Sequence, residues 1–243
     1  MNKRFCMILG ILTGILAAES SFGSSFILPN ADVFCETSSD GLTTTTYNGY
    51  DTGQVNNQVV FGLAAANGVS TGRRRSYIEF TIGSEAVSSA TFWIYNYWGA
   101  NMGGQGNAAG NGSLRLRATP TGTPITITEP LSPVVTDWVA PADTSFTSTI
   151  TTINVTTTGW YSIDVTAWYN ARLGQTTTLA LRGQQVSGYD FPIYEDREGS
   201  AYANGADNTV ANSGPRLEIV AVPEPSAIAL LAVGSLLCYF RRR

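Results

Sequence analysis

Apolar and polar residues alternate in several short segments of this chain. In residues 77–82, the side chains of Ile78, Phe80 and Ile82 fall on one side of an extended backbone. The same period of two recurs in residues 114–117, 161–165, 179–182 and 216–220. Segments of this kind predict strands that have one face against a core and one face in water, which is typical of antiparallel sheets.

The segments between these strands are rich in glycine, asparagine and threonine, as expected for loops. Many short strands joined by such loops predict an all-β fold, a jelly-roll-like antiparallel β-sandwich. One short helix is predicted at residues 166–173, with Thr166 as its N-cap and Gly174 as its stop. Residues 99–112 are expected to form a long loop, and the Thr/Pro-rich residues 121–158 an ordered connection with one or two strands.

Two apolar stretches stand outside this pattern, one near each end. Lys3 and Arg4 precede the apolar residues 5–18, and small residues follow, which indicates a secretory signal peptide. We therefore expect a signal helix in residues 1–23, one β-sandwich domain in residues 24–221, and a sorting segment with a transmembrane helix in residues 222–243. A domain of about 200 residues is long enough to bury a sizeable core.

The sorting segment has three parts in a fixed order. Residues 227–240 are apolar and span about 21 Å as a helix, which is shorter than a usual membrane span. The terminal arginines are expected to stay on the cytoplasmic side, and the prolines keep the preceding tag extended. The tag and the terminal arginines are Val222, Pro223, Glu224, Pro225, Arg241, Arg242 and Arg243.

This layout resembles the PEP-CTERM sorting signal. The resemblance implies export, recognition of the tag by an exosortase, anchoring in the inner membrane through the C-terminal helix before processing, and a final place on the cell surface or in the extracellular matrix.

Four segments of the domain, taken in order, resemble the DNRLRE-type domain, also described as a CBM96-like carbohydrate-binding module. The resemblance implies a jelly-roll sandwich that binds polysaccharide. The chain departs from the family pattern at Glu79, where an arginine is common, and at the additional residue Asp196. The matching segments are Arg75-Ser76-Tyr77-Ile78-Glu79-Phe80, Ser89-Ala90-Thr91-Phe92-Trp93-Ile94-Tyr95, Gly159-Trp160-Tyr161-Ser162-Ile163-Asp164-Val165-Thr166-Ala167-Trp168, and a closing pair, Tyr194-Glu195-Asp196-Arg197-Glu198 with Pro215-Arg216-Leu217-Glu218-Ile219.

Composition narrows the functional classes. The chain has no histidine, which excludes a Ser-His-Asp triad and histidine-ligated metals. Without the basic residues of the two end segments, nine arginines face 18 acids if Glu19 and Glu224 are kept, a net charge of about −9. This excess of acid argues against nucleic acid as a partner. Hydrolysis by two carboxylates stays open, with Glu79, Asp164, Glu195, Asp196 and Glu198 as candidates.

Aromatic residues are concentrated in residues 92–98. The period of two places Trp93, Tyr95 and Tyr97 on the face opposite Phe92 and Ile94. Exposed rings at this spacing can stack on sugars and hydrogen-bond their hydroxyls, so these residues are candidate polysaccharide ligands. The alternative is a strand that is covered on both faces.

Charged residues provide two further candidates. Arg73 and Arg74 could bind an anionic polymer, or could pair with nearby acids. Four acids could hold a structural calcium, with Asp32 and Asp40 as additional donors, although Arg197 among them favours an ion-pair network. The four acids are Asp190, Glu195, Asp196 and Glu198.

Three functions fit these features. The first is non-catalytic binding of extracellular polysaccharide by an exosortase-sorted surface protein that is not an enzyme. The second is a structural matrix or adhesion protein without a sugar site, in which Cys35 could pair between molecules or be a small apolar core residue. The third is a polysaccharide lyase or hydrolase.

Overall fold

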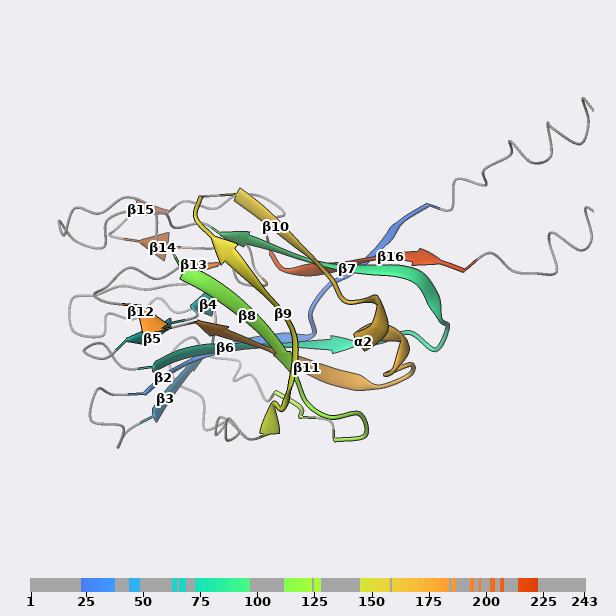
Figure 1. Ribbon diagram of the computed structural model, residues 1–243, viewed down its shortest axis with the longest axis horizontal. Coiled ribbons are helices and arrows are strands. Elements are labelled where there is room, and N and C mark those ends of the chain that lie inside the picture. Colours follow the sequence, from blue (N-terminus) through green and yellow to red (C-terminus); the bar gives the residue numbers. More distant parts are fainter. Residues whose placement is uncertain are drawn as a thin grey trace, which may run out of the picture.

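Within the described residues, two mostly antiparallel sheets, a separate two-stranded ribbon and one short helix make up the computed structural model, which confirms the all-β fold (Figure 1). Each main strand pairs with its neighbours over five or more residues, apart from the three-residue β1. The structure describes residues 23–37, 44–48, 63–64, 66–68, 73–96, 112–123, 125–127, 145–157, 159–183, 185–186, 193–194, 197, 202–203, 206–207 and 214–222.

The first sheet, sheet A, is centred on β7 (Val87–Asn96). On one side of β7 lies β16 (Arg216–Ala221), followed by the edge strand β1 (Ser25–Ile27). On the other side lies β10 (Gly159–Asp164). The short strands β13 (Ile193–Tyr194) and β4 (Leu63–Ala64) extend the sheet next to Asn96.

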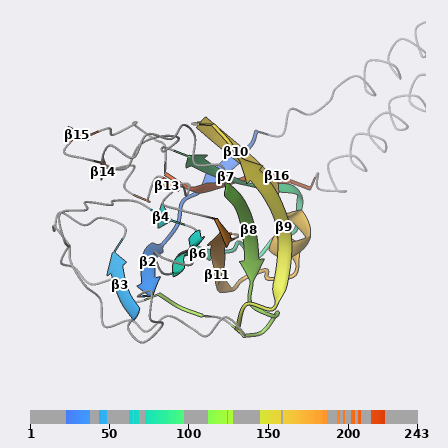
Figure 2. The same ribbon diagram turned by 60° about the vertical axis from the view of Figure 1, so that its left-hand side comes forward.

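The second sheet, sheet B, has the strand order β3, β2, β6, β11, β8, β9, and Figure 2 shows it from left to right in this order. Two short strands are added to this sheet. The first, β5, pairs with β6 in antiparallel orientation, and the second, β12, pairs with β5 in parallel orientation. The strands are β3 (Thr44–Asn48), β2 (Ala31–Thr37), β6 (Arg73–Thr81), β11 (Thr176–Gly183), β8 (Gly112–Ala118), β9 (Ser148–Val155), β5 (Ala66–Gly68) and β12 (Gln185–Val186), with a separate ribbon of β14 (Tyr202–Ala203) and β15 (Ala206–Asp207).

The main core lies between the two sheets. Phe80 of sheet B and Phe92 of sheet A are fully buried, and their rings meet edge to face with centroids 6.2 Å apart. Around them pack the apolar residues of the predicted inner faces, including Ile78, Ile82 and Ile94. The alternation in the sequence therefore identifies the inner faces correctly, because the pleat of each strand sends successive side chains to opposite sides.

A second apolar cluster covers the outer face of sheet B. Tyr77 and Cys35 lie on this face and are buried beneath Phe146 and Ile127, which belong to the Thr/Pro-rich connection. The backbone N–H of Ile127 donates a 2.7 Å hydrogen bond to the buried carboxylate of Glu79. The expected ordered connection is thus partly seen, as a cover for sheet B followed by β9.

The predicted helix forms, but it is shorter than expected and has a different cap. Helix α2 spans Thr166–Asn170, its N-cap position is Val165, and Gly174 follows in a left-handed turn with φ of 70°. Thr166 does not cap the helix because its hydroxyl is engaged elsewhere: it donates to Asp164 at 2.7 Å and accepts from the backbone N–H of Ala90 at 2.9 Å. These bonds attach the helix to β7 and β10.

The expected signal helix and most of the sorting segment lie outside the described residues. Among the residues that are described, no helix has the length and apolar character that crossing a membrane requires.

Candidate functional site

The outer face of sheet A carries the predicted aromatic residues. Along β7, Phe92 and Ile94 are fully buried while Trp93 and Tyr95 are partly exposed on the opposite side. This confirms the orientation that the period of two predicts. Tyr97 lies outside the described residues.

A third ring joins this pair from the neighbouring strand. Trp160 of β10 is the register partner of Tyr95, and 36% of its surface is exposed. Its indole meets the Tyr95 ring at 5.3 Å and 77°, and the Trp93 ring at 6.3 Å and 84°, both edge to face. Rings in this geometry attract one another, so each of the three limits the movement of the others.

An arginine is held between two of the rings on the same face. The guanidinium carbon of Arg216 lies 4.3 Å from the centroid of the Trp160 ring and 4.9 Å from that of Phe26 on β1. Arg216 is the register partner of Trp93, so four strands, β1, β16, β7 and β10, contribute to one arrangement. The planar guanidinium gains cation–π attraction from both rings and aligns them.

Two carboxylates, Glu218 next to the rings and Asp164 farther along β10, lie on the same side of sheet A, and each is oriented through one oxygen. Oε2 of Glu218 accepts a 2.9 Å hydrogen bond from the indole Nε1–H of Trp93. Oδ1 of Asp164 accepts from the backbone N–H of Thr166 at 2.9 Å and from its hydroxyl at 2.7 Å. These bonds from Thr166 lower the pKa of Asp164 below its ordinary value, so the group is an anion at neutral pH.

We refer to this arrangement as the aromatic face. It offers partly exposed rings for stacking and fixed carboxylate oxygens as acceptors, and its side chains are already held in place by one another. These are the chemical features with which proteins bind sugar rings and their hydroxyls. The aromatic face consists of Phe26, Trp93, Tyr95, Trp160, Arg216 and Glu218.

The sequence predicted two of the six residues of the aromatic face, Trp93 and Tyr95, as ligand-binding residues and missed the other four. Trp93 and Tyr95 are on one strand, so the period of two is enough to group them. Trp160 could have been found, because it shares the phase of the exposed Ser162 and Asp164 along β10. Arg216 and Phe26 reach the face only through strand pairing between distant segments.

The predicted arginine patch lies in the other sheet. Arg73 and Arg74 begin β6 in sheet B, so they do not belong to the aromatic face of sheet A. In the strand register Arg74 lies opposite Glu36. Binding of an anionic polymer by Arg73 and Arg74, and their pairing with acids, both stay predictions.

The four predicted calcium ligands lie outside the described residues. Two residues associated with them are described: Arg197, which lies among them in the sequence, and Asp32, a possible additional donor. The backbone N–H of Arg197 donates a 2.7 Å hydrogen bond to the buried Oδ2 of Asp32, and its guanidinium donates to the carbonyl of Asn30. No cluster of three or more metal-binding side chains occurs within the described part of the chain. The calcium site of Asp190, Glu195, Asp196 and Glu198 stays a prediction.

Two of the five candidate catalytic carboxylates are described, and they lie in different sheets. Glu79, in sheet B, is buried and accepts a hydrogen bond from the backbone of Ile127. Asp164, in sheet A, is exposed, and hydrogen bonds from Thr166 lower its pKa. Glu195, Asp196 and Glu198 lie outside the described residues, so hydrolysis by two carboxylates stays a prediction.

Comparison with known proteins identifies the C-terminal segment. Residues 221–243 match the family model of the PEP-CTERM protein-sorting motif. No curated protein matches the chain. The sorting motif indicates an exported, exosortase-sorted surface protein that is linked to the membrane during sorting. The resemblance of the domain to the DNRLRE type has no support from a family match.

Proposed function

We propose that this exosortase-sorted protein binds extracellular polysaccharide without cleaving it, and that the aromatic face of sheet A is the binding site. In this proposal the domain is a jelly-roll-like sandwich related to the DNRLRE type, and its ligand is a component of the matrix to which the protein is delivered.

One observation carries the proposal: three aromatic rings of one open sheet face are fixed in mutual contact by residues of four strands. Trp160 is the most exposed of the three, and it is held by Tyr95, Trp93 and the guanidinium of Arg216. A preformed arrangement lowers the entropic cost of binding, because the side chains need not be ordered by the ligand. A purely structural role for the face would not require exposed indoles.

The test is affinity electrophoresis of the exported chain, residues 24–222, in gels that contain neutral or acidic polysaccharides, with and without calcium. We expect retardation by at least one polymer, and loss of that retardation in Trp160→Ala. Trp160→Phe keeps a ring in the same place and should retain part of the binding. Thr149→Ala, an exposed change on β9 in the other sheet, is the matched control and should bind normally.

A folded domain that no polymer retards would contradict the proposal and favour the structural matrix protein. Shortening of a polymer during the assay would instead favour a lyase or hydrolase.

A further inference from the structure

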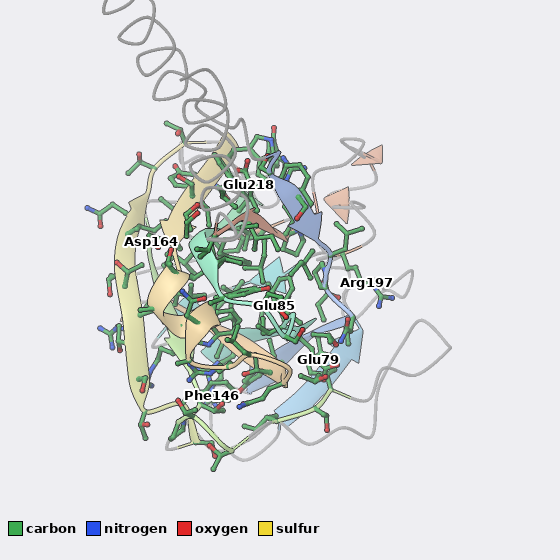
Figure 3. The ribbon with its side chains drawn as sticks, turned by 90° about the vertical axis from the view of Figure 1, so that its right-hand side faces the viewer. Glu79, Glu85, Phe146, Asp164, Arg197 and Glu218 are labelled. Atoms are coloured by element: carbon green, nitrogen blue, oxygen red, sulfur yellow. The ribbon has the colours of Figure 1, made fainter. Side chains whose placement is uncertain are left out.

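Both ends of the domain leave sheet A at the same end of the sandwich. Ala221, the last residue of β16, pairs with Val87 at the start of β7. The edge strand β1 is antiparallel to β16, and Ser25 pairs with Ile219, so the chain enters at this end as well. Helix α2 packs here too, because the side-chain amide of Asn170 bonds both the N–H and the carbonyl of Val87 at 2.9 Å. We call this the exit end; it is on the right in Figure 1 and faces the viewer in Figure 3.

The aromatic face lies toward the opposite end of the same sheet. Trp93 pairs with Arg216 at the start of β16, and Tyr95 pairs with Trp160 near the start of β10. Eight residue steps along β7 separate Val87 from Tyr95, which corresponds to about 27 Å of strand. The rings of Trp93, Tyr95 and Trp160 are therefore far from the two points at which the chain enters and leaves, whereas Phe26 and Glu218 lie nearer to them.

The sorting tag follows the sheet with almost no linker. Ala221 is the last paired residue, Val222 follows, and the tag continues with Pro223-Glu224-Pro225. The match to the sorting motif begins at residue 221, inside the last strand. Prolines restrict the backbone at and before their positions, so the sequence predicts a short and stiff connection.

We propose that the membrane-held chain is oriented so that its exit end points toward the bilayer and the sorting enzyme, and the rings of Trp93, Tyr95 and Trp160 point away from them. The chain then binds its polysaccharide while it is still attached to the membrane. The orientation rests on the strand register and on the position of the sorting tag directly after β16; the statement about the ligand rests on the proposed function.

The orientation can be measured without any ligand. Residues 24–243 with Cys238→Ser, which omit Cys6, are placed in liposomes, and a fluorophore is attached to Glu85→Cys at the exit end or to Ser162→Cys beside the rings. Both positions are exposed in the structure, whereas Cys35 is buried. With short-range quenchers on the lipid headgroups, we expect quenching of the label at position 85 and little at position 162. Equal quenching at the two positions would overturn the proposal.

A second experiment tests the statement about the ligand. It compares the polysaccharide affinity of the full chain in liposomes with that of the exported chain, residues 24–222, in solution. We expect affinities for the polysaccharide that agree within about twofold, which is about 0.4 kcal/mol. A tenfold weaker affinity in liposomes that is restored by a Gly-Ser insertion after Val222 would show that the bilayer blocks the face, and would overturn the proposal. Absence of binding by the exported chain itself would contradict the proposed function and leave the orientation to the quenching result.

Discussion

The outer face of each sheet carries an arginine that contacts two aromatic rings. This group is buried on sheet B and partly exposed on sheet A. On sheet B, Arg182 lies over the rings of Tyr77 and Phe146, at 4.8 and 5.5 Å, and all three residues are buried. On sheet A, Arg216 lies between Trp160 and Phe26, and both rings are exposed. In Figure 3 the labelled Phe146 and Glu218 mark these two opposite sides of the sandwich.

The difference comes from what covers each face. The Thr/Pro-rich connection brings Phe146 and Ile127 onto sheet B, and the carboxylate of Glu79 fixes that cover through the backbone of Ile127. Burial raises the pKa of the Tyr77 hydroxyl, despite the opposing effect of the adjacent Arg182. Among the described residues, sheet A has no comparable apolar cover. An arginine–aromatic group is thus buried within the fold on one face and partly exposed on the other.

The largest expected effect is on the covered face. Phe146→Ala removes a fully buried ring and leaves a cavity above Tyr77, whose ring is 5.3 Å away. We expect the free energy of unfolding to fall by about 3 to 5 kcal/mol, with polysaccharide affinity unchanged in the folded fraction. Urea denaturation followed by tryptophan fluorescence measures the first quantity. A loss below about 1 kcal/mol would mean that the connection does not cover sheet B as described.

The same substitution in the two arginines separates the faces most clearly. Arg182→Met removes a buried 2.9 Å hydrogen bond to the Tyr77 hydroxyl and should destabilise the protein by about 1 to 3 kcal/mol without affecting binding. Arg216→Met should change stability by less than about 1 kcal/mol, and should weaken polysaccharide binding several-fold because Trp160 loses its support. Denaturation and affinity electrophoresis on both variants check this. Reversed effects would contradict the assignment of the two faces.

Structural features that depend on residues close together in the sequence could be predicted here, and features that depend on contacts between distant residues could not. The inner faces of the strands could be predicted, because Ile78, Phe80 and Ile82 follow a local period of two. The cap of α2 could not, because Thr166 bonds to Ala90, which is distant in sequence. For the same reason Glu79, a departure from the family pattern, could not be recognised as the anchor of the connection.

The candidate site follows the same rule. Trp93 and Tyr95 could be grouped from their own strand, whereas Arg216 and Phe26 join them only through a register set by pairing between distant segments. Arg73 and Arg74 were candidates for the same ligand, but no local pattern reveals that they lie in the other sheet.

A moderate effect is expected for the most exposed ring of the open face. Trp160→Ala removes the indole that contacts Trp93 and Tyr95. We expect polysaccharide binding to weaken by about 1 to 2 kcal/mol, roughly 5- to 30-fold, with little change in thermal stability. Isothermal titration against the retarding polymer gives the affinity. If the Trp160→Ala variant binds the polymer as tightly as the unchanged protein, Trp160 is not part of the binding site.

The smallest expected effect concerns acid stability. Hydrogen bonds from Thr166 lower the pKa of Asp164 in the folded protein, so this group stabilises the fold above its ordinary pKa of 3.8 and loses that contribution as the pH falls below it. Asp164 is almost fully solvated, so solvent screens the effect. In Asp164→Asn, the decline in melting temperature below pH 4 should be slightly shallower. A steeper decline would show that the hydrogen bonds have another role.

The most direct test of the account is NMR of the tryptophan indole N–H groups during titration with the polysaccharide. The indole N–H of Trp93 donates to Glu218 within the aromatic face, Trp160 is exposed beside it, and Trp168 is buried in the main core. We predict that the signals of Trp93 and Trp160 shift on titration and that the signal of Trp168 does not. Binding that leaves both Trp93 and Trp160 unshifted, or that shifts only residues of sheet B, would contradict the claim that the open face of sheet A binds the polymer.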